Sequence, residues 1–141
     1  MANLVPDSFK KELFQATHNF NTPAGNVFQL ALYSTVTAFT SSGTTAYTVT
    51  NEVSGTGYSA GGTTLSNLGV SVSNNVSFVD FTDATFSTAT ITASCCLIYN
   101  TTQSNKAVVV LDFGGSKTST NGDFTIQFPA PNSTSAVLRI S

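Results

Sequence analysis

Alternating apolar and polar positions are the main pattern along this chain, and they predict short β-strands. The densest apolar stretch, Ile91–Phe113, reads ITASCCLIYN, then TTQSN, then KAVVVLDF, which is two strand-like runs around a polar loop. In the second run Val109 and Leu111 point to one face, and Val108 and Val110 point to the other. Because a strand that is apolar on both faces must be covered on both, we expect this hairpin at the centre of a sheet.

The same period of two predicts further strands on both sides of the hairpin. Turn residues separate them, for example Asn74–Asn75, and we expect Gly114–Gly115 to end the hairpin before a loop that reaches Asn121–Gly122. With about eight strands in all, the pattern predicts a mostly β fold, an antiparallel β-sandwich or flattened barrel. The strands outside the hairpin are expected at Val27–Tyr33, Ala46–Val53, Leu68–Val72, Val76–Phe81, Phe124–Phe128 and Ala136–Ile140.

A helical period occurs only near the start of the chain. Phe9 and Leu13 lie four residues apart on one face, and Asp7 is placed to cap a helix that begins just after it. We therefore expect a short helix over about residues 8–17, which must be held by packing, and an apolar arm over residues 1–6.

Composition supports one β domain over residues 1–141, with few charges. Only 9% of residues are charged, against roughly 25% in typical soluble domains, and Ser, Thr, Asn and Gly replace them. The net charge is −2 and no basic cluster occurs, so we expect no direct contact with nucleic acid. No apolar run approaches the ~20 residues of a membrane span, and no signal peptide is evident at the start.

Side chains that could carry out chemistry are few and scattered. Cys95 and Cys96 are neighbours in a strand, so they should point to opposite faces as two buried thiols. His18 is the only histidine, and we expect it to cap the last carbonyls of the helix or to lie at the surface. Asp80 and Asp83 have no third acid nearby, and we expect Asp83 to open a turn. With no elbow serine and no metal-ligand spacing, the sequence predicts neither an enzyme nor a cofactor or metal site.

A glycine-rich segment, NEVSGTGYSAGGTTL at residues 51–65, lies in the first half of the chain. It is not a phosphate-binding loop, because no Lys-Ser/Thr pair follows the glycines. We expect an ordered loop that is anchored by Tyr58 and needs backbone conformations that only Gly tolerates. Because ordered surface loops often carry binding, it is also a candidate contact element.

Several segments together carry a resemblance to a known family. They are PDSFKKELFQATHNF, VFQLALY, TNEVSGTGYSAGGTTL, LIYN and AVVVLDFGG, spread over about Ser8–Ile140. They resemble the small virion structural proteins of tailed bacteriophages, and the glycine-rich segment and the opening are the most specific of them. The resemblance implies a place in the phage particle and no catalytic residue.

We therefore hypothesise a capsid decoration (cement) protein on the outer surface of the phage head. Such a protein needs a rigid fold, no cofactor, and surfaces that contact the shell and other copies. The expected partners are the major capsid protein and the chain itself, as a homotrimer. The arm is either a contact element or is disordered or packed on its own domain. The candidate contact residues are Leu4, Val5, Phe9, Gly55, Gly57, Tyr58, Gly61 and Gly62.

Three alternatives remain open. The chain could be a neck or tail component of the particle, which the copy number would reveal. It could be a host-glycan-binding knob or fibre module, for which Tyr33, Tyr47, Tyr58 and Tyr99 are the candidate exposed aromatics in a chain without Trp. A bacterial surface protein outside phages is the third alternative, disfavoured by the missing export signal.

Overall fold

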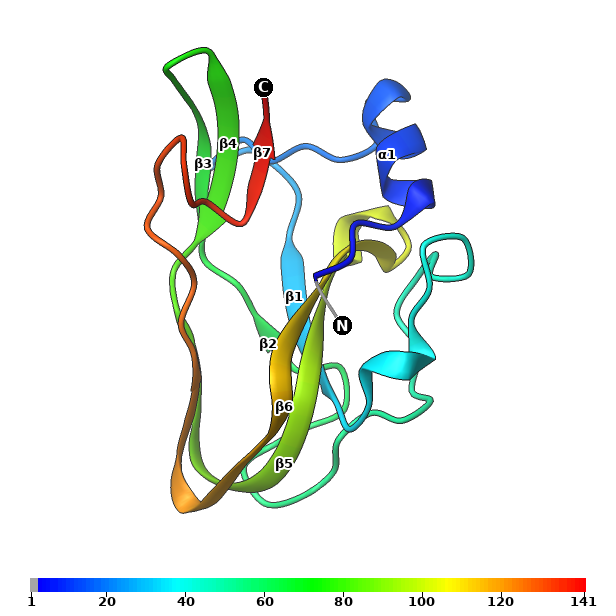
Figure 1. Cartoon of the computed structure of the whole chain (residues 1–141), viewed down its shortest axis with the longest axis vertical. Helices are drawn as coiled ribbons and strands as arrows, with labels where there is room; N and C mark the ends of the chain where they lie inside the picture. Colours follow the sequence, from blue (N-terminus) through cyan, green and yellow to red (C-terminus); the bar gives the residue numbers. More distant parts are fainter. Residues whose placement is uncertain (1–2) are drawn as a thin grey trace.

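Two antiparallel sheets face each other in the structure, a computed structural model that describes residues 3–141 (Figure 1). The first sheet consists of β1 (Phe28–Tyr33), β2 (Thr63–Thr64), β5 (Ala84–Asn100) and β6 (Lys106–Ile126), in the order β2-β1-β5-β6. The second consists of β3 (Asn67–Ser73), β4 (Val76–Phe81) and β7 (Leu138–Ile140), in the order β3-β4-β7. The predicted β-sandwich architecture is confirmed, with sheets that do not close into a barrel and seven strands in the described chain instead of about eight.

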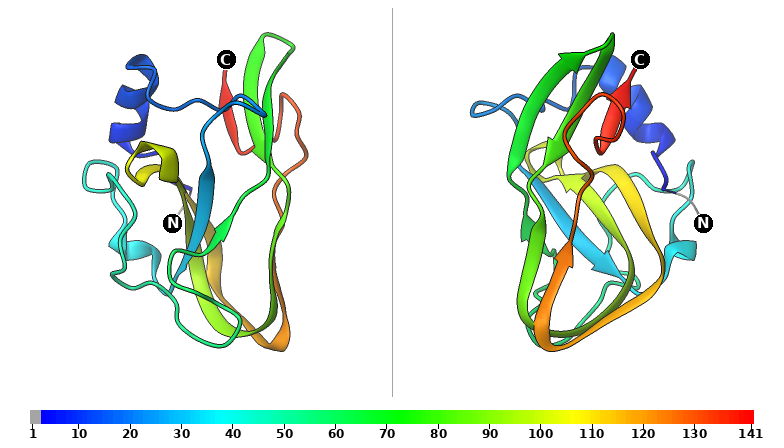
Figure 2. Two further views of the ribbon diagram at one scale, coloured as in Figure 1. Left: turned by 180° about the vertical axis from the view of Figure 1, so that it is seen from behind. Right: turned by 60° about the vertical axis from the view of Figure 1, so that its left-hand side comes forward.

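The hairpin of β5 and β6 is much longer than the sequence predicted. The strands have 17 and 21 residues, and the hairpin bends over so that its two halves lie in opposite layers (Figures 1 and 2). The expected end at Gly114–Gly115 is wrong, because β6 continues through it. Between Cys95↔Asp112 and Ala93↔Lys117, β6 advances five positions while β5 advances two. The glycines are therefore taken up in a large bulge of the strand.

The hairpin is only partly central. β5 lies between β1 and β6, as expected, whereas β6 is the edge strand of its sheet. Coverage on both faces is nevertheless confirmed. One face belongs to the main core between the sheets, with Cys96 and Ile98, and the other packs under an outer layer, with Cys95 and Leu97. The prediction that the adjacent cysteines point to opposite faces is therefore correct.

The outer layer is irregular, and here a predicted strand is absent. Residues 46–53 make only isolated bridges, Ala46↔Lys106 and Tyr33↔Glu52, and no ladder. The segment crosses the face of the first sheet and adds no strand to its edge. It packs on that face and forms hydrogen bonds with it. Tyr47 stacks on Tyr99 at 4.8 Å, and the Tyr33 hydroxyl donates to a carbonyl of the segment. The 3-10 helix η1 (Val36–Ala38) precedes this segment.

The helix α1 (Asp7–Phe14) is shorter than the predicted 8–17 and begins one residue earlier. Its cap position is Pro6, and Asp7 lies in the first turn, where it pairs with Lys10. It ends early because the chain turns at Ala16, which has a φ of 55°. A second 3-10 helix, η2 (Thr101–Gln103), forms the end of the hairpin. The described helices are all too short to cross a bilayer.

Candidate functional site

The side-chain types that bind metal ions are dispersed over the described chain. Among residues 3–141 no three or more His, Cys, Asp or Glu are placed to hold a metal ion together. Cys95 and Cys96 are free, fully buried thiols. Burial raises the pKa of Cys95 to about 12 and also raises the pKa of Cys96. Both thiols are therefore protonated and shielded from reagents.

The two neighbouring acids, Asp80 and Asp83, serve separate contacts. Asp80 is buried, its Oδ1 accepts the N–H of Phe81 at 2.8 Å, and burial raises its pKa. Asp83 accepts the N–H of Phe128 at 2.8 Å, and so joins the start of β5 to the chain that leaves β6. Each carboxylate thus has a structural partner of its own.

His18 lies in the interior, so the expected capping or surface position is wrong. After the turn at Ala16 the chain runs back along α1 and carries the imidazole inward, where its side chain has no exposed surface. Its Nε2 is 3.2 Å from Glu12 Oε2, and its Nδ1 is 3.0 Å from the amide nitrogen of Asn100. The ring also packs against Phe9 at 4.9 Å. His18 therefore joins α1 to the end of the β5–β6 hairpin.

The glycine-rich loop is organised by Glu52, a residue that the sequence did not single out. Its carboxylate accepts the hydroxyl of Tyr58 at 2.6 Å, the N–H of Gly61 at 2.7 Å and the hydroxyl of Tyr47 at 2.7 Å. The Tyr58 hydroxyl in turn accepts the N–H of Leu32. Burial raises the pKa of Tyr58, with the Glu52 carboxylate as a further cause. The predicted anchoring by Tyr58 is confirmed, and the acid placed six residues before it was the available signal.

The glycines hold this loop close to the backbone of the first sheet. A Cβ at Gly62 would overlap the carbonyl oxygen of Leu30, and a Cβ at Gly55 would overlap that of Thr90. Gly57 lies equally close to β5, and Gly61 has a φ of +94°. The need for glycine is confirmed, but it serves attachment to the domain. The exposed side chains that a partner could meet are those of Asn51, Ser54, Thr56, Ser59, Ala60 and Thr64.

The four tyrosines do not form an exposed platform, which corrects the expectation for a glycan-binding module. Tyr33 and Tyr99 are buried, and Tyr47 and Tyr58 are half-buried. Their hydroxyls are used inside the fold, with Tyr99 donating to the Gly61 carbonyl at 2.6 Å. The aromatic faces that would stack on a sugar are therefore covered by the protein itself.

The predicted arm packs on its own domain over the part that is described; residues 1 and 2 lie outside the described residues. Leu4 and Val110 exchange two backbone hydrogen bonds of 2.8 Å each. Val5 packs on the main core, and Phe9 is only 2% exposed within that core. In this state Phe9 is not accessible to a partner, whereas Leu4 and Val5 are half-buried and can still contact one.

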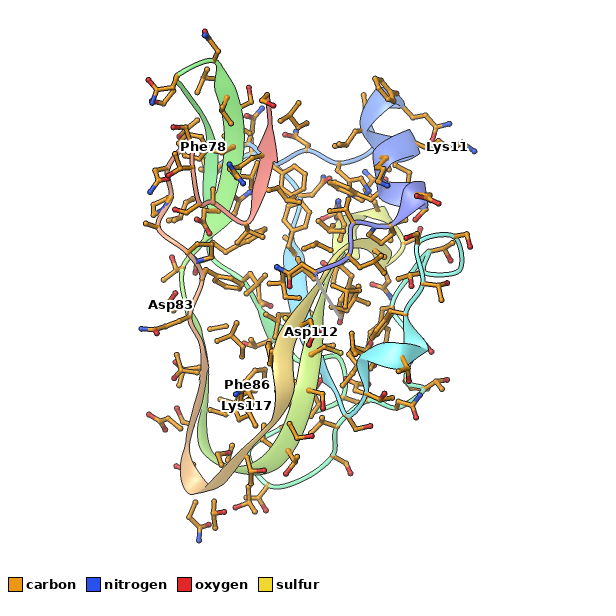
Figure 3. The ribbon with its side chains drawn as sticks, viewed as in Figure 1. Lys11, Phe78, Asp83, Phe86, Asp112 and Lys117 are labelled. Atoms are coloured by element: carbon orange, nitrogen blue, oxygen red, sulfur yellow. The ribbon has the colours of Figure 1, made fainter. Side chains whose placement is uncertain are left out.

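An open groove of about 930 Å³ lies between the two halves of the bent strand β6. Figure 2 (right) shows the course of the two halves of β6 on either side of its bend. Charged side chains line it as well, among them Asp112 and Lys117, which are labelled in Figure 3. The apolar lining residues are Val5, Leu111, Phe113, Phe124, Ile126, Phe128, Pro129, Ala136, Val137 and Leu138.

The outer edge of β6 is largely unpaired within the described chain. From Lys106 to Asp112 it is partly covered by bridges and hydrogen bonds to Asn3, Leu4, Thr45 and Ala46, while the other edge pairs with β5 along its length. Long edge strands present unpaired backbone donors and acceptors that another chain can join. The groove and this edge together make one open side of the sandwich.

A second surface is an apolar patch on the three-stranded sheet. Val70, Val72 and Ile140 are 50%, 71% and 62% exposed. The register places Val72, Ser77 and Ile140 in one row, with Val70 and Val79 in the next, so these apolar side chains share one face. Figures 1 and 2 show this end of the sheet rising beyond the first sheet, at the same end of the molecule as α1. We call Val70, Val72 and Ile140 the apolar patch.

No family model, curated protein or solved structure matches this chain. The open side of the sandwich and the apolar patch are the two surfaces of the described chain that a partner could contact.

Proposed function

We propose that this chain is a structural protein of a tailed-phage virion, a capsid decoration protein that sits on the outer surface of the head. The observation that carries the proposal is the apolar patch. Three aliphatic side chains on one face of the three-stranded sheet are exposed to water in the isolated chain, and exposed apolar patches mark interaction sites.

The proposed partners are the major capsid protein and further copies of the chain, arranged as a trimer. The surface suits close packing because it holds few charges and many Ser and Thr. Hydroxyl groups cost less free energy to desolvate than charged groups, so such a surface can be covered at moderate cost. The outward side of the glycine-rich loop and the half-buried Leu4 and Val5 supply further contact area.

Binding to heads that lack the protein tests the patch. We expect the double variant Val72→Thr with Ile140→Thr to lower the affinity for heads about tenfold or more, because it removes aliphatic surface that binding would bury. Val49→Thr is the matched control, since Val49 is 70% exposed, close to the 71% of Val72, and lies in the outer layer of the first sheet.

Thermal unfolding must be the same for both variants, so that affinity alone is compared. Equal loss of binding in the control, or full binding by the double variant, would reject the patch as the contact surface.

Copy number in purified particles tests the position of the chain in the virion. Hundreds of copies support the head shell, whereas a multiple of six or twelve would place the chain in the neck or tail and overturn the decoration proposal.

A further inference from the structure

The junction between α1 and the β5–β6 hairpin is a buried hydrogen-bond chain with a titratable group at its centre. It runs from Glu12 through His18 to Asn100, and from Asn100 to Asn26 at 2.9 Å. Glu12 is 5% exposed and Asn100 is fully buried, so the chain is shielded from water from Glu12 to Asn100, while Asn26 at its end is half-buried. It joins residues that are 82 positions apart in the sequence.

The hydrogen-bond pattern assigns the tautomer of His18. Asn100 Oδ1 accepts the backbone N–H groups of Thr102 and Gln103, which fixes the orientation of the amide. The amide nitrogen therefore points at His18 Nδ1, and a donor at that place requires Nδ1 to be an acceptor. The proton is then on Nε2, where it is donated to Glu12. A second proton on Nδ1 would face the N–H of Asn100.

Two charged side chains face the imidazole, and they have opposite effects on its pKa: Glu12 raises it and Lys106 lowers it. Glu12 comes from α1, and Lys106 comes from β6 with its Nζ 3.5 Å from the same Glu12 oxygen. β5 contributes the neutral Asn100, and the segment before β1 contributes the neutral Asn26. Burial lowers the pKa of His18, and the attraction of Glu12 offsets only part of this effect. The ring is therefore neutral at neutral pH.

We propose that this junction is an acid-sensitive latch: protonation of His18 at Nδ1 separates it from Asn100 and releases α1 from the ends of β5 and β6. The proton comes from solvent and no covalent bond changes. Because the docked ring binds a proton more weakly than a free histidine, with its pKa of about 6.5, acid favours the released state. Release would also withdraw Phe9 from the core and the arm from the edge of β6. The latch does not depend on the role proposed in the virion.

Hydrogen exchange of the full-length protein between pH 7.5 and 5.0 tests the latch. After correction for intrinsic rates, we expect the opening of α1 amides to increase by up to about tenfold per pH unit below about 6.5. Amides in β1 and the central part of β5 should keep their protection over the same range, which separates local release from global unfolding.

Two variants decide whether His18 is the group that titrates. His18→Gln can donate to Glu12 and accept from Asn100 without titrating, so its α1 exchange should be independent of pH. Asn100→Asp keeps the acceptor for Thr102 and Gln103 and offers an oxygen to protonated Nδ1, so acid should then hold α1 in place. The latch is overturned if the original protein shows no local opening in acid, or if either variant opens with the same pH dependence as the original.

Discussion

Single side chains organise the irregular parts of this protein. Glu52 accepts three hydrogen bonds and holds the glycine-rich loop, while Asn100 caps η2 and reaches His18. Both act through partners that only the folded chain brings together. At this scale the order of the loops depends on a few buried polar groups, whose removal would leave hydroxyls or amides without partners.

Gly62 and Gly114 allow the effect of close packing to be separated from that of backbone conformation. Both have a positive φ, +80° and +75°, but a Cβ would meet the backbone of Leu30 at Gly62 and nothing within 4 Å at Gly114. We expect Gly62→Ala to lower the free energy of unfolding by about 3 kcal/mol or more, from overpacking and strain together. Gly114→Ala should cost only the strain, about 1–2 kcal/mol.

Denaturant unfolding of the two variants measures this difference. Equal losses of stability would show that the loop can move away from β1, and that its contact with the sheet is not tight.

Residues of this kind mark the limit of what the sequence can predict. Tyr58 was expected to anchor the loop, and it is the only aromatic residue in the glycine-rich segment. Glu52 was not identified, since an acid next to a strand-like run has many possible partners. His18 was misplaced because its two partners lie 6 and 82 residues away, on elements whose packing the local pattern does not describe.

At the scale of elements, α1 and the arm before it are attached to the sandwich by Phe9 in the core and by Leu4 at the edge of β6. Phe9 enters the core while Phe14, one and a half turns later, is 95% exposed. The helix has eight residues, too few to be stable alone, so its docking depends on this one buried face. Lys11 points away from the domain on the outer side of the helix (Figure 3).

Phe9 and Phe14 provide a matched pair for testing this docking. We expect Phe9→Ala to lower the free energy of unfolding by about 3–5 kcal/mol, because it leaves a cavity in the core. Phe14→Ala should change it by less than about 0.5 kcal/mol. Chemical denaturation measures both. If Phe9→Ala leaves stability unchanged but weakens binding to a partner, Phe9 is a contact residue and not a core residue.

The alternating pattern predicted most strands because a strand that is buried on one face has apolar residues at every second position. It was misleading in two places for physical reasons. In residues 46–53 the apolar and aromatic side chains cover a sheet face from outside, and such a segment has the composition of a strand without its ladder. At Gly114–Gly115 the glycines indicated a loop, but a bulge can absorb them within a continuous strand.

At the scale of the whole molecule, β5 is the interior strand that separates two differently built layers. Cys96 lies on the side of the main core, and Cys95 lies under the irregular outer layer. The outer layer contributes side-chain packing and a few isolated bridges, whereas the opposite layer is a hydrogen-bonded sheet. We infer that the outer layer opens more easily.

The two thiols can measure this difference directly. In Cys96→Ala only Cys95 remains, and we expect it to react with a thiol reagent faster than Cys96 does in Cys95→Ala. Both reactions should be much slower than that of an exposed thiol, because the side chains are fully buried. The measurement is the labelling rate in native buffer, with complete reaction in denaturant as the reference. Equal rates would indicate that the thiols are exposed only by global unfolding.

The bent hairpin also has a consequence for how the chain folds. Its register begins at Asn100↔Lys106, beside a short connection, and ends at Ala84↔Ile126. Pairing can therefore start at the short connection and extend from there, one residue pair after another. Since the same two strands then enter both layers, the alignment set near η2 is carried into the opposite side of the sandwich. A slip by one position near the start would exchange the side chains that face the main core for those that face the outer layer. We therefore expect the short-range pairing of β5 with β6 to form first and the long-range pairing with β1 to follow it.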